Sequence, residues 1–460
     1  MFEECGDTEL LDLMGAAQQA ERAAFARQLL AVGRFTLRRM EQTAGEHDIW
    51  CVDDWEAVAA EVGAELGISR GRASSHMHYG TTLLERFPAL GACAVDFRVI
   101  AAAIFRTDLL TDTDALATID AQLAAKAPSW NTLSREKITE RVDWLVIELD
   151  PDAVRVAKQR DLDRHIEVGP GQNGMAEIWG EVRGPDAAAF DTKLNELAAT
   201  VCPDDPRTKT QRRTDALSPL AAGATSMACT CGKPDCPAAT TDTPATAIVI
   251  NVIAQAATCA GSSDTPGYLP GYGAIPAATV QELATHASLR PVPSPQDLVA
   301  EPQYRPSAGL ARFIRCRDLT CRWPGCDQPA TGCDIDHSVP YPHGPTHPSN
   351  NKPYCRIHHL FKTFHAGPAG WTETQRPDGT LTWTSPRGRT YTTTPTGALF
   401  FPQLGLPTGK LVLPTSPPPS PNHALAMPTR KRTRTQDRAH RIECERARNR
   451  ARYTADPPPF

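Results

Sequence analysis

The chain has 460 residues, of which 41% are hydrophobic and 22% are charged, a composition that excludes a wholly disordered protein and allows more than one hydrophobic core. The net charge of −5 conceals an asymmetry, because residues 303–460 carry +12 and the preceding residues carry −17. The C-terminal part is therefore the part suited to an anionic partner.

The first residues, MFEECGDTELLDLM, lack the basic start and the apolar stretch of a secretory signal. The best candidate for a membrane span, residues 245–260, is interrupted by Asn251 and Gln255. These features predict a cytoplasmic protein without a membrane partner, and a location at the nucleoid fits them equally well. Fourteen cysteines in such a compartment indicate metal sites rather than disulfides.

The N-terminal three hundred residues predict one large, mostly helical domain with a few strands. Residues 15–165 are rich in Ala and Leu, with apolar residues at three- and four-residue steps that are typical of helices. Further on, residues 165–168 and 175–182 alternate like short strands, residues 185–200 predict a helix and residues 248–253 predict a buried strand.

Residues 61–78, EVGAELGISRGRASSHMH, permit two interpretations. One is a DNA-binding helix-turn-helix in which Gly67 makes the turn and four side chains face a groove, namely Arg70, Arg72, Ser74 and Ser75. The other is an ordinary helical hairpin, which the surrounding charge of −17 favours.

Three cysteines stand close together at Cys229, Cys231 and Cys236. Their spacing predicts a candidate second structural metal site. The spacing does not identify a fourth ligand, and both Cys202 and Cys259 remain open for that position.

The C-terminal part divides into three segments. Residues 286–308 contain five prolines and predict a linker, and a basic Cys/His-rich module follows at residues 309–395, with a predicted hairpin appendage after its core. Residues 396–460 form a Pro-rich and then basic tail, in which residues 430–452 carry ten Lys and Arg against three acids. We expect a disordered or transiently helical basic arm that folds, if at all, on a polyanion such as DNA, although a solubilising tail has the same composition.

Two close-spaced pairs in the module predict a structural zinc site. Cys321 and Cys326 form a C-x4-C pair, and Cys355 and His358 form a C-x2-H pair about thirty residues later. Such pairs across a loop make a tetrahedral site that stabilises a small module. Cys316 and Cys333 are spare candidates in the same window.

A second set of residues in the same module is suited to catalysis. His337 ends a predicted strand and is suited to take a proton from water. Asp336 and His359 are suited to hold a divalent cation such as Mg²⁺ or Mn²⁺, and Asn350 is suited to fix the intervening loop. Lys362 lies one turn beyond His359 and suits either a phosphate or the helix surface.

Residues 312–366 resemble the HNH endonucleases, the ββα-metal nucleases, in their zinc-stabilised form. The resemblance implies hydrolysis of DNA phosphodiester bonds by the residues just named, with a homodimer if both strands are cut. Two positions depart from the family: His358 stands where cysteine is commoner, and Asn351 stands where an apolar residue is usual. Asn351 is therefore the reserve for the role given to Asn350.

The N-terminal region resembles the domain of unknown function that precedes HNH modules in actinobacterial proteins, the thirteen-E-twelve repeat family. Four phrases carry this resemblance: ISRGRASSHMH (68–78), DPDAVRVAKQRDLDRHIEVGP (150–170), GMAEIWGEV (174–182) and VCPDDPRTKTQRRTDAL (201–217). The expected fold class is thus α+β, a mostly helical domain linked to a zinc-stabilised ββα module. The alternative function is a non-catalytic, zinc-dependent DNA-binding regulator that uses residues 61–78.

Overall fold

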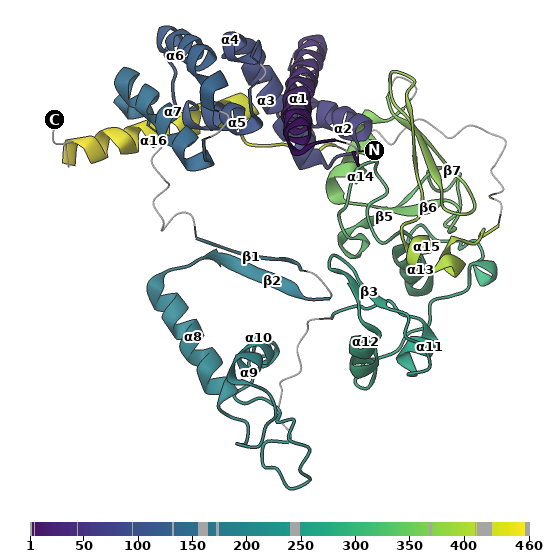
Figure 1. Ribbon diagram of the computed structural model, residues 1–460. Helices are drawn as coiled ribbons and strands as arrows, with labels where there is room; N and C mark the ends of the chain where they lie inside the picture. Colours follow the sequence, from purple (N-terminus) through teal and green to yellow (C-terminus); the bar gives the residue numbers. More distant parts are fainter. Residues whose placement is uncertain are drawn as a thin grey trace. The chain divides into compact units, whose positions relative to one another are not determined.

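The computed structural model describes residues 2–3, 5–43, 45–93, 95–130, 133–154, 164–171, 174–239, 249–367, 370–409, 411 and 426–455. The chain divides into two compact units (Figure 1): unit 1 is Met1–Val156 with Arg290–Phe460, and unit 2 is Ala157–Leu289. This division differs from the expected single domain over residues 1–300, because the first 156 residues group with the C-terminal part. The Pro-rich stretch at residues 413–422 lies outside the described residues.

The N-terminal part of unit 1 is helical, as the apolar periodicity predicts. Its helices are α1 (Asp7–Thr43), α2 (Asp54–Leu66), α3 (Arg70–Glu85), α4 (Pro88–Gly91), α5 (Phe97–Arg106), α6 (Thr113–Lys126) and α7 (Arg135–Leu149), with 3₁₀ turns η1 (Ala127–Trp130) and η2 (Pro151–Ala153). The side chains of Asp53, Asp96 and Asp112 accept backbone N–H groups at the starts of α2, α5 and α6, which explains where these helices begin. Among the described residues, no helix has both the length and the apolar character needed to cross a bilayer.

Helices α1 and α3 cross with their backbones in contact. A Cβ atom on Gly33 would lie 2.2 Å from the carbonyl carbon of Gly80, and one on Gly80 would lie 2.1 Å from the carbonyl oxygen of Leu29. A side chain at either glycine would push the helices apart, so this crossing requires both glycines.

Unit 2 contains short elements. They are β1 (His165–Pro170), β2 (Ala176–Glu181), α8 (Gly184–Ala198), α9 (Lys209–Asp215), α10 (Leu217–Ala221), α11 (Ala256–Cys259), β3 (Gly267–Leu269), β4 (Gly273–Ile275) and α12 (Ala277–Ala284). Strands β1 and β2 form an antiparallel pair, as do β3 and β4.

The two strands and the helix predicted over residues 165–200 are confirmed by β1, β2 and α8. The predicted buried strand at residues 248–253 is wrong for its described part. Val249 and Ile250 are 77% and 74% exposed, and Ile253 forms an isolated bridge with Tyr268. An apolar run becomes a buried strand only when a neighbouring strand pairs with it, and here one residue is paired. Ile248 lies outside the described residues.

The module in unit 1 combines small sheets with short helices. Its elements are η3 (Pro295–Asp297), α13 (Ala308–Asp318), η4 (Ala330–Gly332), β5 (Asp334–His337), β6 (Asn351–Tyr354), α14 (Arg356–His365), β7 (Thr372–Gln375), β8 (Leu381–Thr384), β9 (Thr390–Thr393), α15 (Gly397–Phe400) and η5 (Pro402–Gly405). Strands β5 and β6 are antiparallel, with His337 opposite Asn351, and α14 follows directly. Strands β7, β8 and β9 form the antiparallel appendage, whose first turn contains Gly379 at φ +83°.

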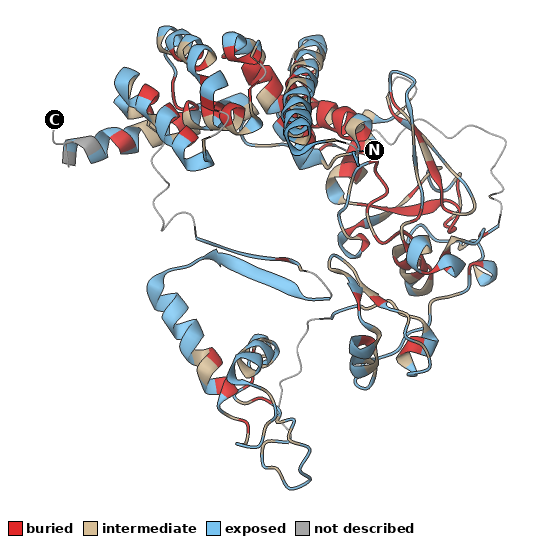
Figure 2. Cartoon of the chain, in the orientation of Figure 1, coloured by how far each residue is buried: buried red, intermediate tan, exposed pale blue. Residues whose placement is uncertain are grey.

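An aromatic core holds the module together. The Trp323 ring lies 4.5 Å from that of Trp383, 4.8 Å from that of Phe361 and 4.9 Å from that of Trp371. Figure 2 shows the burial in this region, where all four residues of β6 are buried, whereas every residue of β2 in unit 2 is exposed. The α+β class and the mostly helical N-terminal part are confirmed.

The predicted disordered basic arm is instead helix α16 (Arg434–Ala455), which spans 22 residues. Ile442 of this helix is buried in the same core as Val142 of α7. The prediction was wrong because the composition of the arm indicates solvation, whereas the arm pairs with carboxylates more than 280 residues earlier in the chain.

Candidate metal centre and catalytic cluster

Four side chains of the module form a group that could hold zinc. The Sγ atoms of Cys321, Cys326 and Cys355 and the Nδ1 atom of His358 all lie within 4.8 Å of one another. The first two cysteines follow α13, and the second pair begins α14, so the group joins the two ends of the ββα segment. Trp323 stacks on the His358 ring at 5.1 Å and covers it.

The two spare cysteines lie outside this group. Cys333 places its Sγ atom 3.3 Å from the carbonyl oxygen of Pro329, and Cys316 is buried in α13. Burial raises the pKa of the Cys316 thiol to about 11, which is the behaviour of an apolar core cysteine. The geometry therefore selects the four predicted ligands over the two alternatives.

Next to this group, a carboxylate and an imidazole converge. Asp336 Oδ1 on β5 lies 3.6 Å from His359 Nε2 on α14, and His359 Nδ1 lies 2.8 Å from Asp334 Oδ2. The pKa of His359 is raised, above all by its contact with Asp336 and despite burial. A carboxylate oxygen beside an imidazole nitrogen is a donor pair that suits a hard or borderline divalent cation.

Two lysines keep Asp336 ionised. Burial alone would raise the pKa of Asp336, but the ammonium groups of Lys352 and Lys362 hold it well below its usual range. Lys352 is completely buried, and its Nζ atom lies 2.6 Å from Glu373 Oε1. Lys362 contacts Asp336 and also Glu373, so it lies inside the cluster rather than on the helix surface.

The hydrogen bonds of His337 identify which ring nitrogen carries the proton. His337 is 3% exposed, and its Nε2 atom lies 2.9 Å from Thr346 Oγ1. The Thr346 hydroxyl donates its one hydrogen to the carbonyl oxygens of Gln303 and Tyr304, so Nε2 must be the donor and Nδ1 the acceptor. Burial lowers the pKa of His337 to about 4, and the ring is therefore neutral at pH 7. Nδ1 is the basic atom.

Asn350 fixes the loop between β5 and β6. Its Oδ1 atom accepts the backbone N–H of Val339 at 2.8 Å, and its Nδ2 atom donates to the carbonyl oxygens of Val339 and Pro345. Asn351 instead accepts the backbone N–H of His347 at 2.7 Å. Both side chains are fully buried, and Asn350 makes the loop-spanning contacts expected of it.

Several residues of the cluster were missed in the sequence. Asp334 had a usable signal, because residues two apart on a strand face the same side and Asp334 precedes Asp336 by two. No sequence signal pointed to Lys352, Thr346 or Glu373, because each of them acts through a partner at least nine residues away.

Residues 61–78 do form two helices joined at Gly67, which has φ +63°. However, the carbonyl oxygen of Ile68 would lie 2.5 Å from a Cβ atom on Gly325, so the turn packs against the module. Arg70, a predicted DNA contact, is ion-paired with Glu56 at 2.8 Å. The arrangement is therefore a helical pair whose turn lies within unit 1.

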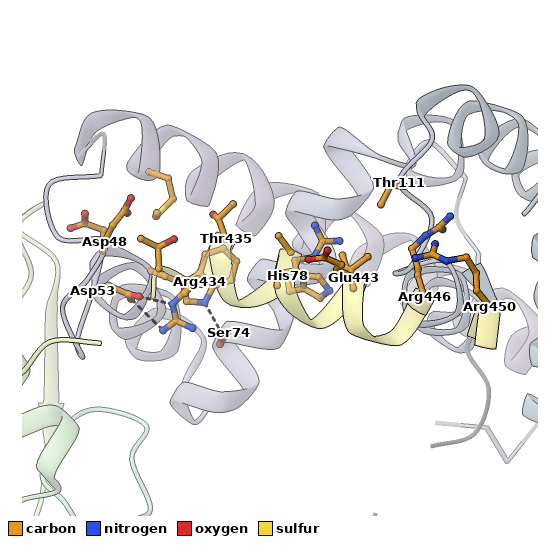
Figure 3. Close-up of a pocket in the computed structure, with 17 residues that line it drawn as sticks. Asp48, Asp53, Ser74, His78, Thr111, Arg434, Thr435, Glu443, Arg446 and Arg450 are labelled. Carbon is orange, nitrogen blue, oxygen red and sulfur yellow. Dashed lines mark hydrogen bonds and ion pairs between the residues drawn. The ribbon is translucent and has the colours of Figure 1, made fainter. Parts of the chain in front are cut away.

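The arginines of α16 face acidic residues of the same unit. Figure 3 shows Arg434 directed at Asp53, to which its Nε atom is 2.6 Å away. Arg441 lies 2.7 Å from Asp108, and Arg446 lies 2.7 Å from Asp150. A cavity of about 840 Å³ runs beside the helix. Part of the positive charge predicted for DNA is thus paired within the chain.

The second cysteine cluster gathers a fourth thiol. The Sγ atoms of Cys229, Cys231 and Cys236 lie within 4.8 Å of one another and of Cys202, and these four form a second group that could hold zinc. Cys259, the other candidate, is not in the group.

Comparisons with known proteins match the N-terminal part to a family without assigned function. The family model described as "Domain of unknown function (DUF222)" matches residues 16–318. The uncharacterized protein Rv3776 of Mycobacterium tuberculosis is 43% identical over 96% of this chain and 90% of its own length. The uncharacterized protein Rv2100 of the same organism is 42% identical over 99% of this chain and 90% of its own. No solved structure matches the chain significantly.

Proposed function

The chain belongs to the DUF222 family, and on that premise we propose that it is a metal-dependent DNA endonuclease of the HNH type. The observation that carries the proposal is the cluster of Asp336, His359 and neutral His337 on a β-β-α segment. A cysteine group that only stabilised the module would need none of these three side chains.

The proton chemistry centres on His337. Its Nδ1 atom takes a proton from water, the water oxygen bonds to phosphorus, and the bond from phosphorus to the leaving oxygen breaks. Thr346 keeps Nδ1 unprotonated by accepting from Nε2. Asn350 holds the loop that carries Thr346.

Asp336 and His359 are the residues that would hold a divalent ion, Mg²⁺ or Mn²⁺. The ion would supply charge neutralisation on the phosphate and stabilise the leaving oxygen. Lys352 and Lys362 maintain Asp336 as the carboxylate that such an ion requires. Arg356, whose side chain is 66% exposed and pairs with Asp334, is the residue that we expect to contact the DNA backbone.

The test is nicking of supercoiled plasmid by the full chain, with and without Mg²⁺ or Mn²⁺. We expect His337→Ala to lower the rate by ~10²–10⁴-fold, the usual contribution of a general base. His343→Ala, in the same loop, is the matched control and should nick like the wild type. Zinc content should be unchanged in both variants. Nicking by His337→Ala at the wild-type rate would refute the assignment, and conversion of plasmid directly to the linear form would indicate paired modules.

A second candidate is a DNA-binding regulator that acts through α2 and α3. The left-handed turn at Gly67 supports it, whereas the packing of that turn against the module and the ion pair between Arg70 and Glu56 count against it. A regulator would bind DNA in a salt-sensitive manner, and neither the wild type nor His337→Ala would cleave it. Arg72→Ala, at an exposed position of α3, would then weaken binding, whereas the endonuclease proposal expects no change in nicking from this variant.

A further inference from the structure

The four thiols of unit 2 have the spacing of ligands around one ion. Cys202 follows α8, and the other three lie on the loop after α10. A tetrahedral zinc ion with bonds of ~2.3 Å places its sulfur atoms ~3.8 Å apart. The Sγ atoms of Cys202 and Cys229 are 3.4 Å apart, too far for a disulfide, and all four thiols are free.

Backbone N–H groups point at three of these sulfur atoms. In each case the donor lies two residues after the cysteine: Asp204 for Cys202, Lys233 for Cys231 and Ala238 for Cys236. Gly232, at φ +73°, makes one of these turns possible. In the module, Gln328 donates to Cys326 in the same way. Hydrogen-bond donors of this kind orient the ligand atoms of a metal site.

The two loops that carry the thiols are tied together by a buried carboxylate. Asp205 pairs with Arg207 at 2.8 Å and accepts the backbone N–H of Thr230 at 3.0 Å. Arg207 in turn donates to the carbonyl oxygen of Ala228. Since Thr230 lies between two of the cysteines, this network sets the distance between the loops, as partners of metal ligands do elsewhere.

A positive charge lies beside the sulfur atoms. Lys233 lies two residues after Cys231, and its ammonium group pairs at 2.6 Å with Asp204, which lies two residues after Cys202. Four thiolates around a divalent ion carry a net charge of about −2. Lys233 therefore offsets part of the charge that a loaded site would bring.

The surrounding core is small. It consists of Leu194, Leu197, Val201, Ala216 and Met227, and neither α9 nor α10 contains a buried residue. Segments with so few buried side chains are usually stabilised by disulfides or a metal. Thiolates select soft or borderline metals, and four protein ligands close the site to substrate.

We propose that Cys202, Cys229, Cys231 and Cys236 bind one structural zinc ion, so that the chain carries two zinc ions, one in each unit. The inference does not depend on the proposed nuclease activity. It depends on the geometry of unit 2.

Zinc content of the purified full chain tests the proposal. We expect two zinc ions per wild-type chain and one per Cys231→Ser chain, whereas Cys259→Ser, in the same unit but outside the group, keeps two. Cys326→Ser should also fall to one, through loss of the module's ion. A wild-type chain with one zinc, or a Cys231→Ser chain with two, would overturn the proposal, as would iron in this site.

Cobalt substitution keeps the test decisive if Cys231→Ser unfolds locally. The wild type loaded with Co²⁺ should show two spectroscopic components, one from four sulfur ligands and one from three sulfur ligands and one nitrogen. Cys231→Ser should lose only the four-sulfur component and should still nick plasmid. A single component in the wild type overturns the second site, whereas absent nicking by a wild type with two zinc ions counts only against the nuclease proposal.

Discussion

The two cysteine groups use the same chemistry in different surroundings. In the module, Cys321 and His358 are buried, and Trp323 stacks on the His358 ring and packs against Trp383. In unit 2 the four cysteines lie on loops and are half-buried, beside a core of five buried side chains. In the module, a metal would stabilise a fold that already has a packed aromatic core. In unit 2, a metal would provide most of the stabilisation that a larger core provides elsewhere.

Removal of zinc should expose this difference most strongly. A structural zinc ion contributes an apparent ~10–16 kcal/mol, as much as the whole stability of a typical domain. Hydrogen exchange after chelation should show complete loss of amide protection in residues 199–239, while β8 keeps part of its protection through the tryptophan core. Equal loss in both regions would contradict the comparison.

Truncation of the aromatic core should produce the next largest effect, and only in the module. Trp383 is fully buried, so Trp383→Ala should lower the free energy of unfolding by ~3–5 kcal/mol. Trp179→Ala, at an exposed position of β2, is the matched control and should change it by less than ~0.5 kcal/mol. Denaturant unfolding followed by circular dichroism measures both. A Trp383→Ala protein as stable as the control would show that the core is not what holds the module.

The carboxylate network of unit 2 should tune zinc affinity. Asp205→Asn removes the charge that holds Arg207, and we expect ~10–100-fold weaker zinc binding at this site, measured by competition with a chelator. Asp204→Asn, at an exposed side chain, should have a smaller effect. If both variants bind zinc like the wild type, the loops are held by the metal alone.

The same network predicts a pH dependence. The hydrogen bond from Arg207 holds the pKa of Asp205 well below its ordinary range. A depressed pKa means that the stabilisation is complete above the ordinary value of ~3.9 and is lost only as the pH falls below it. Between pH 5 and 8, the contribution of Asp205 to the stability of unit 2 should therefore be constant. A difference in melting temperature between the wild type and Asp205→Asn that changes with pH in this range would contradict the assignment.

Loss of the hydroxyl at Thr346 should have the smallest effect, confined to catalysis. Thr346→Val removes the acceptor that keeps the proton on His337 Nε2, and one hydrogen bond is worth ~0.5–1.5 kcal/mol, or about 2- to 12-fold in kcat. KM and zinc content should not change, and Thr374→Val on the exposed face of β7 should be silent. A rise in KM at constant kcat would instead place Thr346 in DNA binding.

The spacing of residues that are close in the sequence explains which features of the fold and the site could be predicted. The pairs Cys321–Cys326 and Cys355–His358, the turn at Gly67 and the strand that ends at His337 all depend on neighbours within a few residues, and the structure shows each of them. The ββα order follows from these signals because each element is short and bounded.

Contacts between residues that are far apart in the sequence explain which features could not be predicted. The choice of Cys202 over Cys259 depends on the path of the chain between Cys202 and Cys229, which are 27 positions apart, and the cysteine spacing contains no information about that path. The folding of α16 depends on Asp108, and the position of Lys362 depends on Glu373. No local pattern carries such information, because each partner looks like an ordinary surface residue by itself.

The most direct test of the proposed chemistry is rescue of a His337→Gly variant by imidazole. The variant should cleave a labelled DNA duplex at least ~10²-fold more slowly than the wild type, and added imidazole should restore part of the rate in a metal-dependent reaction. The same addition should leave His343→Gly unchanged. Wild-type cleavage by His337→Gly without imidazole would contradict the role of His337 as the base.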